Sequence, residues 1–305
     1  MVRIFSKSAI PAILGAYVQL ASSLVIPGIY PPSQSQPNPI VEIYGPLPVT
    51  ATINSTFAIV PIPLSEARAR IPAQYGILTA AYQELLPGWP SDMYPLVVTS
   101  ALEHDIHGFG IIIPDFTTFR LSFPFVDLLN DGYSNFVYAP VNWMNANVVG
   151  ILGLTVYGLF TPASTMDPPS DPYAFVPAAQ ASAPGQVYFN FTEIGGGPNS
   201  PTGYVKYTPS GTVDVPWDFV RNVTNQPFTG NGIICDNQIR IFNTRLTQPP
   251  FSPIPVSGSV FLDSALYSLK INTNTAKGWL FAAAFLENNF IPCPLLKGYN
   301  GAGNS

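Results

Sequence analysis

The chain has 305 residues, and its 12 Lys and Arg against 17 Asp and Glu leave a net charge of −5. Charged residues make up 10% of the chain, well below the roughly one quarter of a soluble domain, whereas hydrophobic residues make up 47%. So few cations exclude an electrostatic nucleic-acid footprint, and so much apolar surface excludes a disordered chain. We therefore expect a globular protein with no nucleic-acid partner, whose chemistry uses few titratable groups.

The N-terminus has the pattern of a secretory signal peptide. Arg3 and Lys7 precede a short apolar run at 10–20, and small residues follow it, which predicts a cleaved signal over residues 1–23. An uncleaved anchor or a buried helix is the alternative. The run is too short for a stable membrane span, and Pro11 interrupts it. The predicted location is the secretory pathway, with the protein secreted or held in the ER or vacuolar lumen.

Two further features fit that route. Acceptor patterns for N-glycosylation begin at Asn54, Asn190 and Asn222. Cys235 and Cys293 are the only cysteines, and an oxidising compartment favours a disulfide between them. A pair of buried free thiols is the alternative.

The remaining chain divides into a proline-rich extended lead-in over 24–52 and a single domain over 53–305. Short helices are expected at 64–71, which follows Pro63, and at 77–86. The expected strands are 53–62, 96–98, 109–113, 116–125, 136–138, 186–191, 203–207, 232–235, 238–245 and 258–269. Many short strands without a βα rhythm predict an α+β fold, mainly an antiparallel β-barrel or sandwich with few short helices.

A small and apolar stretch at 147–157 is suited to a buried helix, with Gly158 at its end. The loop at 161–184 that follows is long enough to be a lid or an insertion.

Residues 61–72 and 139–163 resemble the acetoacetate decarboxylase superfamily. The second stretch looks like the family's barrel strand, its small-residue helix and its motif G-R-E-(aromatic)-G-F-P-K-K-(L)-A. Gly153, Tyr157, Gly158 and Ala163 fall on that pattern. Together with the signal sequence, this is similar to secreted fungal members of the superfamily. The resemblance implies an acetoacetate decarboxylase-like fold over about residues 57–290.

The family's essential lysine is missing where the resemblance places it. In the family, an uncharged lysine forms a Schiff base with a β-keto acid. The tandem lysine positions match Thr161 and Pro162, and no lysine lies between Lys7 and Lys206. Ordinary decarboxylation is therefore expected to be lost. A relocated lysine, Lys206 or Lys270, is the alternative.

Acid–base groups gather around the two histidines. If residues 103–107 form a strand, its alternation places Glu103, Asp105 and His107 on one face and His104 on the other. That face would suit acid–base catalysis or a weak metal site. The alternative is a polar solvent face or a turn. We expect no cofactor and no metal.

Three further residues are candidates for contact with a substrate. Arg120 lies in an otherwise apolar strand, where its charge either pairs in the interior or faces water. In the first case it could hold a carboxylate or enolate. Tyr157 and Thr161 could donate a hydrogen bond to a carbonyl.

These features predict a lyase- or cyclase-type enzyme that acts without a Schiff-base lysine on a small apolar, polyketide-type secondary metabolite. The alternative is a secreted protein that binds a small molecule without turning it over. A small apolar molecule is the expected partner, and a homo-oligomer is left open.

Overall fold

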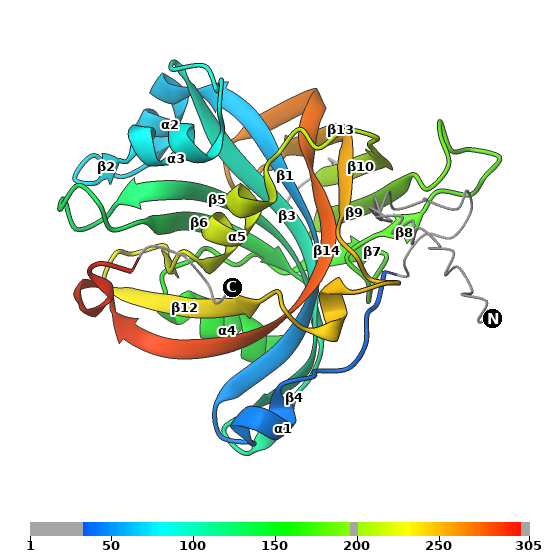
Figure 1. Ribbon diagram of the computed structural model, residues 1–305, viewed down its shortest axis with the longest axis horizontal. Coiled ribbons are helices and arrows are strands. Elements are labelled where there is room, and N and C mark those ends of the chain that lie inside the picture. The colour runs from blue at the N-terminus through cyan, green and yellow to red at the C-terminus, as the bar shows by residue number, and fades with distance from the viewer. Residues whose placement is uncertain (1–32, 196–200, 300–305) are drawn as a thin grey trace, which may run out of the picture.

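A large β-sheet that closes on itself organises the chain (Figure 1). The computed structural model describes residues 33–195 and 201–299. The predicted signal peptide, residues 1–23, lies outside the described residues. No helix in the described ranges is long and apolar enough to cross a membrane.

The closed ring runs in the order β1, β3, β5, β6, β11, β12, β14, and β14 pairs back to β1. Its strands are β1 (Val49–Pro63), β3 (Met93–Gly108), β5 (Phe116–Asp127), β6 (Phe136–Met144), β11 (Phe228–Thr229), β12 (Ile234–Ile241) and β14 (Lys270–Pro292). β1 is buried along most of its length because β3 and β14 flank both of its edges. Its threonines, isoleucines and valines suit such a strand.

The 23-residue strand β14 joins this ring to a second part of the sheet. One edge of β14 pairs with β1, while the other pairs first with β13 and then with β12. From β13 the sheet continues through β10 and β9 to β7. The remaining strands are β13 (Ile254–Asp263), β10 (Gly203–Pro209), β9 (Val187–Glu193), β7 (Ser164–Asp167), β8 (Ala174–Phe175), β4 (Ile111–Ile113) and β2 (Gly76–Ile77). β6 pairs with β11 in parallel, and the other pairings between these named strands are antiparallel.

Helices cover only parts of this sheet. They are α1 (Val41–Tyr44), α2 (Leu64–Arg70), α3 (Thr79–Leu85), α4 (Val148–Val156) and α5 (Trp217–Asn225), with 3₁₀ turns η1 (Arg245–Thr247) and η2 (Cys293–Leu296). The α+β class and the two early helices are as predicted. The sequence interpretation missed α5, although Phe219, Val220 and Val223 bury one face of it.

Three expectations about segments need correction. The helix predicted at 147–157 forms as α4, but none of its residues is buried. The predicted lead-in, 24–52, runs too far because β1 already begins at Val49. The loop at 161–184 is tied to the sheet, because β7 and β8 both pair with β9.

Aromatic side chains fill the core where β5 and β6 meet β9. The ring centroid of Phe191 lies 4.6 Å from that of Phe119 and 5.0 Å from that of Trp143. The indole Nε1 of Trp143 donates a 2.6 Å hydrogen bond to Glu193. This packing holds β5, which carries Arg120, against its neighbours.

Candidate functional site

A pocket of about 200 Å³ is formed by strands of the closed ring together with α4 and the β3–β4 turn. Its walls are mostly apolar and include Ile106, Phe109, Phe116, Leu154, Phe228 and Phe290. Five polar side chains are grouped on four strands, and we call them the floor: Glu103, Arg120, Asp236, Gln238 and Glu287. The pocket therefore offers an apolar space with a polar end.

The sheet register brings the floor residues together. Asp236 and Gln238 alternate along β12, so they point to the same side of the sheet. Gln238 lies directly opposite Glu287 of β14. A register shift between Cys235 and Asn237 falls at Asp236, and such irregularities commonly re-aim side chains beside active sites.

The other two floor residues come from adjacent strands. Glu103 of β3 lies opposite Phe116 of β5, and Arg120 follows four residues later on β5. The Arg120 guanidinium lies 4.6 Å from the ring centroid of Phe228, over its face. That contact and the nearby carboxylates hold the cation inside the protein.

Burial changes the proton affinity of every acid in this group. It raises the pKa of Asp236 to about 7 and raises the pKa of Glu287 well above its ordinary value. A hydrogen bond joins these two carboxyls, and it favours the proton on Glu287. Burial also raises the pKa of Glu103, although the Arg120 charge opposes that effect.

Two arginines balance these acids. Burial lowers the pKa of Arg120, and it lowers that of Arg240, two residues beyond Gln238 on β12, to about 10. Arginine keeps its charge in proteins, so two cations face this group. When Glu287 holds its proton and Glu103 and Asp236 are both ionised, the cluster is neutral. This neutrality makes so many buried ionisable groups tolerable.

Several floor atoms have no hydrogen-bond partner although they are buried. They are Arg120 Nε, Asp236 Oδ1 and Gln238 Oε1, and Thr118 Oγ1 lies beside them in the pocket wall. Most buried polar atoms in native proteins are paired. The unpaired atoms of the floor therefore indicate a place where a ligand or a water molecule supplies the missing hydrogen-bond partners.

Tyr157 and Asn289 form a second polar feature, in the wall. The Tyr157 hydroxyl donates a 2.6 Å hydrogen bond to Asn289 Oδ1 and accepts one from the backbone N–H of Phe290. Burial raises the pKa of Tyr157, so its hydroxyl remains a donor. The Asn289 side-chain nitrogen has no partner within residues 33–195 and 201–299, and it can donate to a ligand.

Of the predicted catalytic residues, Glu103, Arg120 and Tyr157 line the pocket. Of the two positions expected for Arg120, the structure shows the first: its charge lies in the interior among carboxyl groups, and it does not face water. Thr161 is not a lining residue, and its hydroxyl donates to the backbone carbonyl of Leu159 at 3.3 Å.

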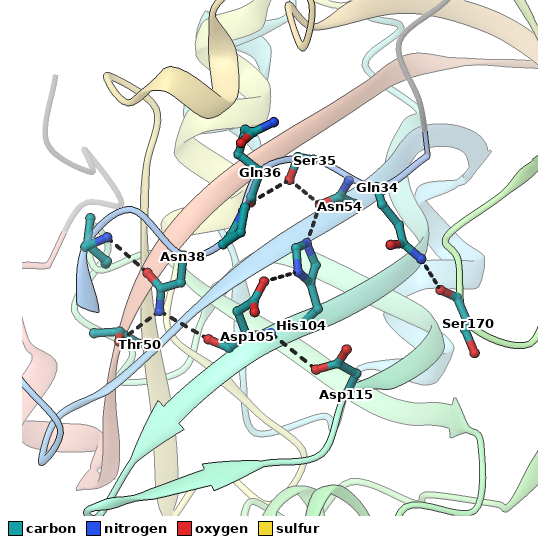
Figure 2. Close-up of polar contacts among 12 residues, drawn as sticks. Gln34, Ser35, Gln36, Asn38, Thr50, Asn54, His104, Asp105, Asp115 and Ser170 are labelled. Carbon is teal, nitrogen blue, oxygen red and sulfur yellow. Dashed lines mark hydrogen bonds and ion pairs between the residues drawn. The ribbon is translucent and has the colours of Figure 1, made fainter. Parts of the chain in front are cut away.

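The expected shared face of Glu103, Asp105 and His107 is wrong. Two residues of β3, Asp105 and Ile106, lie against one residue of β1, and Asp105 has a positive φ of 49°. The irregularity reverses the alternation, so Ile106 joins Glu103 in the pocket while Asp105 and His107 do not. Figure 2 shows Asp105 bonded to His104 Nδ1 at 2.7 Å. No group of three or more His, Cys, Asp or Glu within the described ranges is arranged to hold a metal ion.

The same network excludes Asn54 as a glycan carrier in the folded chain. Asn54 is buried in β1, where Oδ1 contacts His104 Nε2 at 3.0 Å (Figure 2). Its Nδ2 donates to the backbone carbonyl of Ser33 at 2.6 Å. A glycan on Nδ2 would have to displace these contacts. Asn190 and Asn222 are partly exposed, and N-glycosylation at these two sites stays a prediction.

The predicted disulfide between Cys235 and Cys293 is present. It joins β12 to η2, one residue before Asp236. Lys206 is exposed on β10, and Lys270 forms a 3.0 Å ion pair with Asp263. Neither lysine lines the pocket.

Sequence reasoning missed Asp236, Arg240, Glu287 and Asn289. A signal for them was present: Asp236, Gln238 and Arg240 alternate within one strand, and Glu287 interrupts a long apolar run. A charged residue inside an apolar strand indicates a candidate site residue, and this applies to Glu287 as it does to Arg120.

Among known proteins, no family model and no curated sequence matches the chain. A solved structure of the enduracididine biosynthesis enzyme MppR, with HEPES buffer bound, matches with a TM-score of 0.51 and 11% identity over 81% of this chain and 88% of that one. A second MppR structure, complexed with the condensation product of pyruvate and imidazole 4-carboxaldehyde, matches with a TM-score of 0.51 over 82% and 90%. The chain has the fold of MppR.

The acetoacetate decarboxylase-like fold expected from the sequence is thereby confirmed. A structure of acetoacetate decarboxylase itself matches with a TM-score of 0.43 and 8% identity, over 80% of this chain and 90% of that one. These identities describe a shared fold and carry no statement about activity.

Proposed function

We propose that the protein is a lyase- or cyclase-type enzyme that uses acid–base chemistry, without a Schiff-base lysine, on a small apolar carbonyl compound of the polyketide type. The observation that carries this proposal is the buried pair of Glu287 and Asp236 beside Arg120, at the polar end of an apolar pocket.

The floor supplies both halves of acid–base catalysis: Glu287 of this pair is the candidate acid, and Glu103 is the candidate base. Burial and the Asp236 charge raise the pKa of Glu287 well above its ordinary value, which favours its protonated form. A carboxylic acid held neutral in an apolar site can donate a hydrogen bond or a proton to a carbonyl oxygen. Glu103 lies near Arg120, whose charge favours the ionised carboxylate against the effect of burial on its pKa, and it is the candidate base.

The pocket also supports a defined orientation of the substrate. Its apolar walls would hold the hydrocarbon part, while the carbonyl oxygen would meet the polar end. There, Arg120 and the Asn289 amide can stabilise the negative charge of an enolate. Holding two reacting groups of one molecule together can lower a barrier by several kcal/mol.

The reaction class follows from these roles. Glu103 removes a proton from the carbon next to the carbonyl, and the electron pair becomes an enolate. In a cyclisation, that carbon forms a bond to a second carbonyl carbon of the same molecule, and Glu287 protonates the new alkoxide. In a lyase step, the enolate instead expels a leaving group from the β-carbon, and Glu287 protonates it. Neither route needs a lysine.

The placement of the lysines supports the lysine-free route, because Thr161 stands at the family's lysine position and the pocket lining of the described residues contains no lysine. The fold shared with MppR, a biosynthetic enzyme by its name, is in keeping with a role in biosynthesis.

The test is incubation of the purified protein with a panel of apolar 1,3-diketones and longer poly-β-ketones, followed by mass spectrometry. We expect a new product with the native protein and with Glu84→Gln, a matched change on the exposed face of α3, and none with Glu287→Gln. If all three proteins bind the compound but leave it unchanged, the result would support the alternative function, a protein that binds a small molecule without turning it over. A borohydride-trapped adduct on Lys206 or Lys270 would contradict the lysine-free route.

We also propose that the protein passes through the secretory pathway. The disulfide supports this, because such bonds persist in oxidising compartments. Treatment of the secreted protein with a glycosidase should lower its mass through Asn190 or Asn222, and intracellular retention of the full-length, unmodified chain would contradict the proposal.

A further inference from the structure

Large apolar side chains are exposed around the mouth of the pocket. Leu47, Phe109, Ile111, Val148, Val149 and Leu152 are each between 51% and 70% exposed, and we call them the apolar rim. Large contiguous apolar surfaces are rare on soluble monomers and mark interaction sites.

Hydrogen bonds make this rim one surface. The N–H of Phe109 donates to the Leu47 carbonyl at 2.9 Å, which ties the β3–β4 turn to the segment after α1. The Asn147 side chain donates to the Pro114 carbonyl at 3.0 Å, which ties the start of α4 to the end of β4. Figure 1 shows α1 and β4 together at the lower tip of the molecule. Phe109 and Val149 also line the pocket, so the rim adjoins its mouth.

Helix α4 shows why this surface needs a covering. Its sequence, VVGILGLTV, contains no charged residue, and apolar side chains lie on every face of the helix. A helix that is apolar all round is normally buried in a protein or in lipid. Here no residue of α4 is buried.

We propose that the apolar rim seats the protein on an uncharged lipid surface, with the pocket mouth facing the acyl chains. Aliphatic and Phe side chains are those that interfacial segments insert at the headgroup boundary. Protein interfaces are instead enriched in aromatic residues, Met and Arg, and Phe109 is the one rim residue of these types.

Charge selects the kind of lipid. Between Arg70 and Lys206 the only Lys or Arg is Arg120, which lies in the pocket floor. The rim therefore has no cation to attract anionic headgroups, and the chain as a whole carries a net charge of −5. A neutral lipid surface matches it, whereas an anionic one would repel it.

The position of the mouth favours lipid over a second copy of the chain. A protein seated on the rim would close the pocket, whereas an acyl layer dissolves apolar molecules and leaves the route from lipid to pocket open. Delivery of the ligand by this route rests on the proposed function; binding to lipid does not.

The test is flotation of the full chain with vesicles of phosphatidylcholine. A rim variant, Ile111→Ser with Leu152→Ser, is compared with a control variant, Val213→Ser with Leu295→Ser. The two control positions are 63% and 76% exposed, against 60% and 63% for the rim pair, but lie in other segments of the chain. The rim variant should show about a 100-fold lower partition into vesicles, about tenfold for each side chain, while the control binds like the native protein. Because all four side chains are exposed, both variants should keep the native melting temperature.

Absence of the native protein from the floated vesicles would overturn the proposal, as would equal flotation of the rim variant. Tighter binding as anionic phosphatidylserine is added would contradict the neutral surface. A native dimer that the rim variant dissociates, with no flotation, would assign the rim to a second copy. None of these outcomes depends on turnover, so they separate this proposal from the proposed function.

Discussion

The Tyr157 hydroxyl donates a 2.6 Å hydrogen bond to the side-chain oxygen of Asn289 in the pocket wall. Because Tyr157 is buried at the end of α4 and Asn289 lies on β14, this bond joins the two sides of the pocket. It also fixes the direction of the Asn289 amide, whose nitrogen is left to meet a ligand.

Tyr157→Phe should weaken ligand binding and turnover by about tenfold, because one net hydrogen bond is worth about 1 kcal/mol and the Asn289 amide becomes free to rotate. Asn289→Asp should cost more, since it replaces the donor by an acceptor. Titration calorimetry with an apolar ketone measures both. Tyr204→Phe on β10 is the control; affinities unchanged in both pocket variants would remove Tyr157 and Asn289 from the site.

Stability should fall as pH rises from about 4 to about 7. The carboxyl of an unfolded Asp titrates near pH 4, whereas burial raises the pKa of folded Asp236 to about 7. The folded state therefore holds more protons in this window, and the free energy of unfolding falls by at most about 1.4 kcal/mol per pH unit for each such group. Urea unfolding of Asp236→Asn should show a flatter profile than the native protein. The exposed control Asp92→Asn should keep the native slope, and a native slope in Asp236→Asn would contradict the assignment.

Arg120→Leu should destabilise the protein by about 3–5 kcal/mol, because it leaves the buried carboxyls of Glu103, Asp236 and Glu287 with one cation instead of two. Arg120→Lys keeps the charge and should cost less. Arg221→Leu removes an exposed ion pair to Asp218 at 3.5 Å and should cost under about 1 kcal/mol. Denaturant unfolding at neutral pH gives all three values, and a loss for Arg120→Leu as small as that for Arg221→Leu would place Arg120 in solvent.

Removal of the disulfide should lower both stability and ligand affinity. The Cys235–Cys293 bond closes a loop of sequence separation 58, for which a stabilisation of about 2–4 kcal/mol is typical. Cys235 immediately precedes Asp236, so its loss also loosens the floor. Thermal melts and ligand titrations of Cys235→Ser/Cys293→Ser measure these effects. Loss of stability with unchanged affinity would separate the disulfide from the site.

The residues that the sequence could identify are those whose local context is unusual. Arg120 stands out as a charge in an apolar strand, and the resemblance to a family motif placed Tyr157. Glu103 was found for the wrong reason, since the irregularity at Asp105 breaks the alternation that grouped it with His107. Such an irregularity depends on pairing with β1 and leaves no local signal.

The pairing of Asp236 with Glu287 was beyond local reasoning because the two residues meet only when the sheet closes. They lie on β12 and β14, about fifty residues apart in the chain, and sheet register alone brings them together. The exposure of α4 was equally hidden, because an apolar helix predicts burial and only the fold shows that nothing in the described chain covers it.

The most direct test of lysine-free acid–base catalysis is the exchange of α-protons of a medium-chain methyl ketone for deuterium, followed by proton NMR. The native protein should accelerate this exchange, Glu103→Gln and Glu287→Gln should each slow it by about 10²-fold or more, and prior borohydride treatment with the ketone should leave the rate unchanged. Equal rates for the native protein and both variants, or loss of exchange together with a trapped lysine adduct, would contradict the account.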